Sequence, residues 1–403
     1  MTVTEKFLRY VSVDTMSCPD CEEVPSTIKQ RNLSQMLYNE LVDLGATNCL
    51  IDQHNYVYAT IPATTKTKST LGFIAHVDTS PAVSDTDVCP VITDNYDGGD
   101  IKMGKGYVLS SKEYKSLLNH INETVICTNG QTLLGADDKA GVAEIMQLAQ
   151  ILLTDKSILH GEISIAFTPD EEVGRGADFF DVSRFGADFA YTIDGGELGE
   201  IEYENFNAAS ALVEVFGVSI HPGTAKNKML NAILIAQELF SMLPKEQNPM
   251  YTEGYEGFFH LDNIVGNVDY TKCNYIIRDH NIDKFEDKKK LMKQICDFIN
   301  VKYGKGTVKL TLKDSYFNMY EKILPHIHLI DNAKQAMILA NVEPKVMPIR
   351  GGTDGARLSF MGLPCPNLCT GGYNFHGRYE YITSQSMEKV VQILLNVVEL
   401  YSK

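Results

Sequence analysis

The chain is 403 residues long, which exceeds the size at which a single hydrophobic core stops growing, so two domains are expected. Its apolar content of 44% and charged content of 22% are those of ordinary globular proteins and exclude a disordered or fibrous chain. The formal charge of −16 argues against nucleic acid and anionic membrane surfaces as partners.

No apolar run approaches the ~20 residues that span a bilayer, and the start of the chain lacks the layout of a secretory signal. These features predict a cytoplasmic protein, in which nine cysteines are not a disulfide framework. Cys18 and Cys21 have C-x-x-C spacing, but a structural zinc site needs a second pair, for which Cys365 and Cys369 are only a weak candidate. We therefore expect unpaired thiols at Cys18 and Cys21, with redox control as the alternative.

The first half of the chain alternates helices and strands. A capping box of Thr2 and Glu5 opens the first helix, and Gly45 ends the second. Helices are expected over 2–12, over 27–44 and after 138, and strands over 56–61, 71–75, 162–168 and 189–193. Residues 81–131, rich in Asp, Asn and Gly, are expected to form a long excursion. Such alternation predicts a mainly parallel sheet covered by helices.

The pattern changes after about residue 206. Strand, helix, strand, strand, helix and strand are expected in that order over 209–216, 225–242, 257–269, 274–279, 284–301 and 307–312. This is the order of a ferredoxin-like unit. The α/β pattern resumes from about 320 and closes with an amphipathic helix over 384–401. We therefore predict an α/β catalytic domain over 1–206 and 316–403, with an inserted α+β domain over 207–315.

Metal-ligand residue types gather in five short stretches, three of which follow a predicted strand. They are residues 76–79, 135–138, 170–172, 194–196 and 375–377. The carboxyl ends of strands form the ligand crevice of open α/β sheets, and unpaired acids gathered there are costly without cations. Taken singly, each stretch has an ordinary explanation as a structural histidine, a solvated acid pair or a helix cap. Their combination in one chain indicates a metal site.

Two imidazoles and three carboxylates suit a pair of divalent ions, and zinc accepts both nitrogen and oxygen donors. They belong to His76, Asp137, Glu172, Asp194 and His376. Asp137 stands where a helix is expected to begin and is suited to bridge the two ions. A water between ions about 3.5–4 Å apart would lose a proton near neutral pH and become the nucleophile.

Two further acids remain. Asp78 follows His76 by two residues in a strand-like run, so it is expected to reach the second ring nitrogen and fix its tautomer. Glu171, beside a ligand, is expected to take the proton of the water and return it to the leaving amine.

The chain resembles the M20 family of metallopeptidases, and within it the tripeptide aminopeptidases, over essentially its whole length. The matching stretches are GFIAHVDT (72–79), TLLGADDKAG (132–141), FTPDEEVGRG (167–176), HPGTAK (221–226), PIRGGTDGA (348–356) and TGGYNFHG (370–377). The resemblance implies hydrolysis of short peptides with a free amino terminus, by removal of the first residue of a tripeptide.

The resemblance also divides the metal ligands. It implies that His76 and Asp194 hold one zinc ion, that Glu172 and His376 hold the other, and that Asp137 bridges them. Manganese or cobalt are possible substitutes for the two zinc ions in each subunit.

The roles of the two remaining acids follow in the same way. The resemblance implies that Asp78 orients His76 and that Glu171 is the proton acceptor.

By the same resemblance, residues 207–315 form a lid and the contact surface of a homodimer. His221 would reach the active site of the partner subunit and stabilise the oxyanion on the scissile carbonyl. Arg350, before a glycine-rich turn, and Arg278, at the end of a predicted strand, are candidates to capture the terminal carboxylate of a peptide.

Other activities fit the same predicted metal site. A dipeptidase, a carboxypeptidase or an N-acyl amino-acid deacylase would differ only at the far end of the substrate pocket. A non-catalytic binding protein on the same fold is a more distant alternative.

Overall fold

The computed structural model describes residues 1–402, which form two compact units. The first unit comprises Met1–Tyr203, Glu321–Met347 and the chain from Thr353 onward. The second comprises Glu204–Tyr320 together with the short segment Pro348–Gly352. No helix in the described part of the chain is long and apolar enough to span a membrane.

An eight-stranded mixed sheet is the centre of the first unit. In spatial order its strands are β1 (Thr47–Ile51), β2 (Val57–Ile61), β8 (Ile163–Thr168), β3 (Leu71–His76), β9 (Phe189–Gly195), β16 (Asn367–Cys369), β10 (Glu200–Glu202) and β15 (Lys345–Val346). The run β8-β3-β9-β16 is parallel, as is the edge pair β10-β15, whereas β1-β2, β2-β8 and β16-β10 are antiparallel. The strands are buried at the centre because side chains on both faces are covered.

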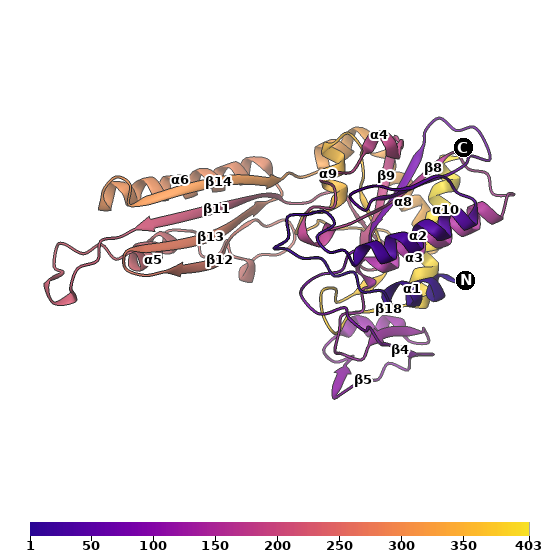
Figure 1. Cartoon of the computed structure of the whole chain (residues 1–403), viewed down its shortest axis with the longest axis horizontal. Helices are drawn as coiled ribbons and strands as arrows, with labels where there is room; N and C mark the ends of the chain where they lie inside the picture. Colours follow the sequence, from indigo (N-terminus) through magenta and orange to yellow (C-terminus); the bar gives the residue numbers. More distant parts are fainter. Residues whose placement is uncertain (403) are drawn as a thin grey trace. The chain divides into compact units, whose positions relative to one another are not determined.

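Helices cover both faces of this sheet (Figure 1). They are α1 (Val3–Val11), α2 (Gln30–Leu44), α3 (Ala136–Thr154), α4 (Val182–Phe185), α8 (His328–Leu339), α9 (Asp354–Phe360) and α10 (Ser384–Tyr401), and the short α7 spans Tyr320–Ile323. Ile74 and Ala190 pack with Phe185 of α4 and Leu358 of α9. Tyr191, the next residue along β9, points the other way, and its hydroxyl donates to Leu329 O at the start of α8.

The helix ends follow the signals in the sequence. The capping box of Thr2 and Glu5 is present at the start of α1, and Gly45 ends α2 with φ 93°, a left-handed conformation that favours glycine. The closing helix has the predicted bounds, because Thr383 accepts the N–H of Ser386 as an N-cap.

Gly141 allows α3 to approach the end of β9. A Cβ atom at this position would overlap the Ile193 carbonyl oxygen and the Asp138 carboxylate. Because backbone cannot yield to it, Gly141→Ala is expected to lower the free energy of unfolding by about 2–3 kcal/mol in urea titrations. Gly351→Ala, where a Cβ would meet no neighbour, is the control and is expected to change stability by less than about 0.5 kcal/mol.

The excursion over residues 81–131 contains strands that the sequence analysis did not predict. A small sheet has the order β17 (Gly372–Tyr373), β18 (Tyr381–Thr383), β7 (Val125–Thr128) and β4 (Pro90–Thr93), and β5 (Ile101–Gly104) pairs with β6 (Tyr107–Leu109). These strands are two to four residues long, too short for an alternating pattern. They are held by a tyrosine-rich cluster with Tyr96, Tyr373 and Tyr381 at its core.

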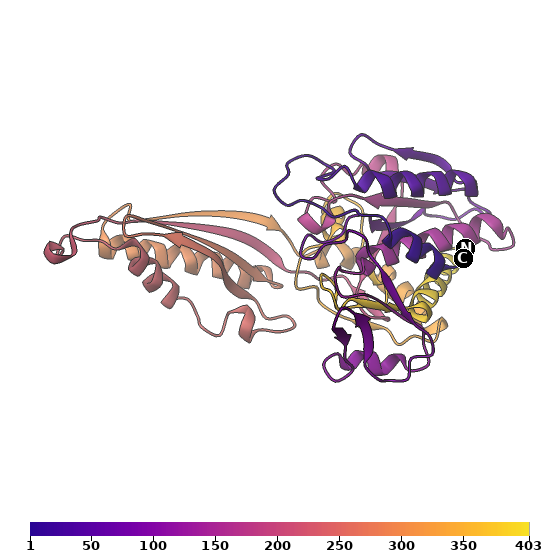
Figure 2. The same ribbon diagram turned by 60° about the horizontal axis from the view of Figure 1, so that its bottom comes forward.

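The second unit is a four-stranded antiparallel sheet with two helices. Its elements are β11 (Asn207–Phe216), α5 (Ala232–Ser241), β12 (Phe258–Gly266), β13 (Tyr270–Asp279), α6 (Ile282–Tyr303) and β14 (Val308–Tyr316). The strand order is β12-β13-β11-β14. Both helices lie on one face of the sheet (Figures 1 and 2) and enclose an apolar cluster that includes Val213, Ile277 and Ile295.

Helix α5 begins seven residues later than expected. The Asn231 side chain caps the N–H groups of Ile233 and Leu234, so the helix begins there, while Pro222–Thr224 forms a separate short 3₁₀ turn. The order of elements is the predicted one. The predicted fold class, an α/β domain with an inserted ferredoxin-like α+β domain, is therefore confirmed.

Candidate metal centre

Three neighbouring parallel strands bring acidic and imidazole groups to one edge of the large sheet. His76 is the last residue of β3, Asp194 lies near the end of β9, and β8 runs into Asp170 through Glu172. Because β8, β3 and β9 are parallel, their carboxyl ends meet at the same edge.

Two triads of metal-ligand groups form at this edge. His76 Nε2 lies 3.1 Å from Asp137 Oδ1 and 3.4 Å from Asp194 Oδ1. His376 Nε2 lies 2.9 Å from Asp137 Oδ2 and 2.9 Å from Glu172 Oε2. Within each triad the three ligand atoms lie within 4.8 Å of one another, and Asp137 belongs to both. The structure thus brings all five predicted ligands together in two overlapping groups.

Asp137 is turned toward the histidines by the start of α3. Gly135 is the N-cap, and Asp137 and Asp138 have non-helical backbone angles, so the Asp137 carboxylate does not cap the helix. Asp138 accepts the backbone N–H of His76 at 3.0 Å and so ties the helix start to the end of β3.

Asp78 connects the first histidine to the acidic loop. His76 Nδ1 lies 2.9 Å from the Asp78 carbonyl oxygen and 3.3 Å from its carboxylate. The same carboxylate accepts the backbone N–H groups of Glu171 and Glu172 at 3.0 and 3.2 Å. Asp78 is fully buried, so its contacts define both the ring orientation of His76 and the course of the loop.

The pKa values of the centre are shifted because its carboxylates are buried close together. Burial and the nearby Asp137 carboxylate raise the pKa of Glu172 to about 7, against the opposing effect of His376 and His76. Burial with the Asp194 charge raises the pKa of Glu171 well above its usual range. Hydrogen bonds to Asp137 and Glu172 raise the pKa of His376 to about 11. The imidazole thus holds a proton where a metal ion would otherwise compensate the carboxylates.

A second observation also fits bound metal. Among the described residues, Glu172 Oε1 is a buried oxygen without a hydrogen-bond partner. A buried acceptor of this kind is costly unless it has a partner. With two nitrogen and three carboxylate donors in overlapping triads, the residues present fit a pair of divalent ions of the zinc type.

The three residues predicted to contact substrate all lie in the second unit. His221 is exposed, and its Nδ1 accepts the N–H of Gly223. Arg278 Nη1 donates to Arg350 O at 2.8 Å, and its buried Nε has no partner in the described part of the chain. Their substrate roles stay predictions.

Arg350 binds backbone carbonyl groups and an aromatic ring of the second unit. Its guanidinium donates to the carbonyl oxygens of Thr252, Gly254 and Glu256 and lies over the Phe206 ring. These contacts hold the segment before β12. Among the described residues Arg278 thus keeps a donor without a partner, whereas the hydrogen bonds of Arg350 to Thr252, Gly254 and Glu256 are made within the second unit.

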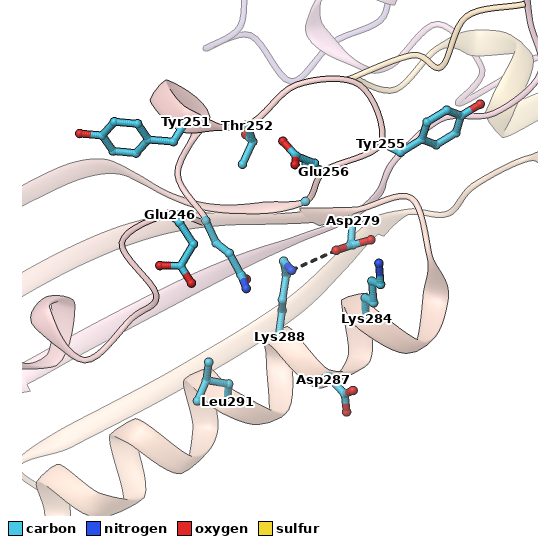
Figure 3. Close-up of a pocket in the computed structure, with 12 residues that line it drawn as sticks. Glu246, Tyr251, Thr252, Tyr255, Glu256, Asp279, Lys284, Asp287, Lys288 and Leu291 are labelled. Carbon is cyan, nitrogen blue, oxygen red and sulfur yellow. Dashed lines mark ion pairs between the residues drawn. The ribbon is translucent and has the colours of Figure 1, made fainter.

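A hollow of about 640 Å³ lies in the second unit beside the same segment (Figure 3). Lys288 and Asp279 form an ion pair of 3.0 Å in it, and Tyr251 and Tyr255 line it. None of the residues predicted for metal binding or catalysis lines this hollow. The residues that line it belong to the second unit.

Glu380 supports the centre but was not predicted from the sequence. Its carboxylate accepts the N–H groups of Leu134, Gly135 and Asp137 at 2.7, 2.8 and 3.0 Å, and it is buried. The signal available in the sequence was an acid four residues after His376, which by itself is too common to interpret.

Replacing Glu380 by glutamine tests this support. Because the amide nitrogen cannot accept an N–H, one backbone donor at the start of α3 would lose its partner and Asp137 would shift. We expect metal affinity to fall about 10–100-fold, the usual effect of removing a group that orients a ligand. Competition with a metallochromic chelator measures it. An unchanged affinity would show that the helix start holds Asp137 without this carboxylate.

Comparison with known proteins identifies the family. Residues 203–307 match the model of the peptidase dimerisation domain. A protein of Alkaliphilus oremlandii named peptidase T is 55% identical over 406 residues, which cover 100% of this chain and 99% of that protein. The chain belongs to the peptidase T family of M20 metallopeptidases. Like that family, it is an enzyme, an aminopeptidase that hydrolyses peptide bonds.

Solved structures share the fold of this chain. The chain is similar to aminopeptidase PepT of Bacillus cereus, with TM-score 0.80, 23% identity and coverage of 100% of this chain and 98% of that one. A tripeptidase of Staphylococcus aureus gives TM-score 0.80 at 21% identity, with coverage of 99% and 98%. A dinuclear metal-binding M20 peptidase of Bacillus subtilis, the YXEP protein, gives TM-score 0.66 at 12% identity, with coverage of 99% and 97%.

Proposed function

We propose that this member of the peptidase T family removes the amino-terminal residue of tripeptides at a centre that holds two zinc ions. The observation that carries the proposal is the pair of triads with Asp137 in common. The name of the Staphylococcus aureus neighbour, a tripeptidase, supports the substrate class, and the dinuclear Bacillus subtilis neighbour supports two ions.

The division of ligands follows the two triads. His76 and Asp194 would hold one ion, Glu172 and His376 the other, and Asp137 both. Two divalent ions bound there would polarise the scissile carbonyl and lower the pKa of a water molecule near it. Manganese or cobalt would fit the same nitrogen and oxygen donors, with manganese bound more weakly than zinc or cobalt.

The remaining chemistry belongs to Glu171 and Asp78. Glu171 would accept the proton of the attacking water and return it to the leaving amine, since it directly precedes the proposed ligand Glu172 and its backbone N–H is bound by Asp78. Asp78 holds the backbone N–H groups of Glu171 and Glu172, so it would position the base as well as orient His76.

The second unit would supply substrate recognition and assembly. The match of residues 203–307 to a dimerisation domain supports a homodimer. We assign the peptide carboxylate to Arg278, because its Nε has no partner among residues 1–402, and the oxyanion to His221 of the partner subunit. Arg350 would serve by holding the adjoining segment.

A panel of peptides tests the substrate class. We expect turnover of tripeptides with free amino termini, with kcat/KM at least about 10-fold higher than for matched dipeptides and tetrapeptides, which amounts to about 1.4 kcal/mol of barrier. N-acylated tripeptides are expected to be inert. Turnover of acylated substrates with none of tripeptides would instead favour a related deacylase.

Removal of metal tests the centre separately. Dialysis against a chelator is expected to abolish hydrolysis, and adding two equivalents of zinc per chain is expected to restore it. Manganese and cobalt form the other arms of the same titration. Full activity of metal-free protein would disprove the proposed mechanism whatever the substrate.

A further inference from the structure

Cys18 and Cys21 face each other across a tight turn. The backbone N–H of Cys21 donates to Cys18 O at 3.3 Å, which closes the turn around Pro19 and Asp20. Both thiols are partly exposed, and their sulfur atoms are 2.6 Å apart. The turn therefore holds two accessible sulfurs close to bonding distance, because an S–S bond is about 2.05 Å long.

The same turn is tied to the loop of the metal centre. The N–H of Cys18 donates to Ser26 Oγ at 2.9 Å. Ser26 in turn donates from its backbone N–H to the Asp170 carboxylate at 2.6 Å and from its hydroxyl to the other carboxylate oxygen. Asp170 is buried and directly precedes Glu171, the proposed proton acceptor. One chain of hydrogen bonds thus joins Cys18 to the backbone that positions Glu171.

The Cys18 side of the turn is anchored directly, and the Cys21 side is anchored further along the chain, at Ser26 and Gln30. Ser17, before Cys18, donates its N–H to Thr79 O at 3.1 Å. Gln30, on the other side, donates to the Asp170 carboxylate at 2.7 Å. A displacement at Cys18 is therefore passed on through Ser26.

We propose that Cys18 and Cys21 form a reversible thiol–disulfide site that adjusts the turnover of the enzyme through Ser26 and Asp170. The oxidant is a low-molecular-weight disulfide. The Cys18 thiolate attacks one sulfur of this small disulfide. A mixed disulfide forms between Cys18 and that sulfur, and the other half leaves as a small thiolate. The Cys21 thiolate then attacks the Cys18 sulfur and releases the second small thiolate. The protein loses two electrons and two protons, and the small disulfide becomes two thiols.

The order of attack follows the contact between the two sulfurs. Cys21 donates its S–H toward Cys18, and this hydrogen bond is the main cause that raises the pKa of the Cys21 thiol. The sulfur that accepts the bond is the better first nucleophile. The effect on turnover rests on the proposed role of Glu171, whereas oxidation of the pair does not.

Oxidation is expected to slow the chemical step. Bond formation fixes the two sulfurs at about 2.05 Å and restrains the backbone that carries the Cys18 N–H, the donor to Ser26. Catalytic geometry is sensitive to small shifts, since a misplacement of about 1 Å costs about 100-fold. We expect kcat to fall about 2–10-fold with KM changed less than twofold, and the loss to reverse on reduction.

The experiment uses zinc-loaded full-length enzyme equilibrated with oxidised and reduced monothiol at graded ratios, then desalted. Desalting matters because small thiols bind zinc and would inhibit by removing it. Maleimide labelling with mass spectrometry of the peptide containing both cysteines detects an internal disulfide as a loss of two hydrogens. Zinc content, kcat and KM are measured on the same samples.

Three variants complete the test. Cys21→Ser is expected to keep the reduced-state activity and lose the response, and Cys89→Ser, at an exposed cysteine outside the turn, is expected to keep the response. Ser26→Ala is expected to form the disulfide without the fall in kcat relative to its own reduced form.

The proposal is overturned if the pair forms no internal disulfide under excess oxidant, since labelling is independent of activity. It is also overturned if the disulfide forms and kcat is unchanged, or if Cys21→Ser responds like the parent. Loss of activity in every sample, reduced or oxidised, would count against the proposed peptidase mechanism and not against the labelling result.

Discussion

Glu171→Gln is expected to lower kcat for tripeptide hydrolysis by about 10²–10⁴-fold while two metal ions per chain remain bound. Glutamine has the shape of glutamate but cannot accept the proton of the attacking water. The loss corresponds to about 2.7–5.5 kcal/mol of barrier, the range in which a positioned general base contributes.

The environment of Glu171 explains the large fall in kcat that we expect when this carboxylate is replaced. Its backbone N–H donates to the Asp78 carboxylate, so the backbone that carries the Glu171 side chain is fixed beside the two triads. Desolvation and the Asp194 charge raise its pKa well above the usual range of a glutamate.

The matched control is Glu113→Gln, which makes the same chemical change on the exposed surface. Its kcat is expected to stay within about twofold of the parent, since surface changes of this kind are nearly neutral. Metal content by elemental analysis accompanies both variants. If Glu171→Gln kept both its metals and its kcat, another group would have to take the proton.

Local signals in the sequence predicted elements where the pattern is long and well capped. Helix α10 has the predicted bounds because an apolar stripe of five turns begins at a threonine cap. The starts of α2 and α5 were placed too early, because periodicity extends into residues that fold as turns. In α5 the decisive group was the Asn231 side chain, whose capping bonds depend on geometry that a pattern does not contain.

The candidate ligands could be predicted because they stand at strand ends and because parallel strands share an edge. His76 and Asp194 illustrate this, since β3 and β9 are neighbours in the sheet. Glu380 could not be predicted in the same way. It contacts residues about 245 positions earlier in the chain, and the four short strands that bring it there leave no periodic signal.

Asp137→Asn is expected to remove both metal ions, whereas Asp194→Asn is expected to remove only one. Asp137 presents one carboxylate oxygen to His76 and the other to His376, so each triad uses a different oxygen of the same group. An asparagine retains one acceptor oxygen and replaces the other by an N–H donor, which repels a cation. Asp194 belongs to one triad alone.

The measurement is metal stoichiometry after dialysis at a fixed free zinc concentration. We expect about two ions per chain for the parent, about one for Asp194→Asn and fewer than about 0.3 for Asp137→Asn. Thermal unfolding gives an independent readout, because bound ions stabilise the folded state by mass action. Addition of zinc should raise the melting temperature of the parent and leave that of Asp137→Asn unchanged.

The contrast between the two aspartates separates a shared centre from two independent sites. If each ion had its own complete ligand set, Asp137→Asn and Asp194→Asn would each cost one ion and retain partial metal binding. In a shared centre the bridging carboxylate also screens the repulsion between two cations about 3.5–4 Å apart, so its loss destabilises the pair beyond the loss of a single bond. One ion retained by Asp137→Asn, with normal melting behaviour, would therefore mean that the two triads do not act as one centre.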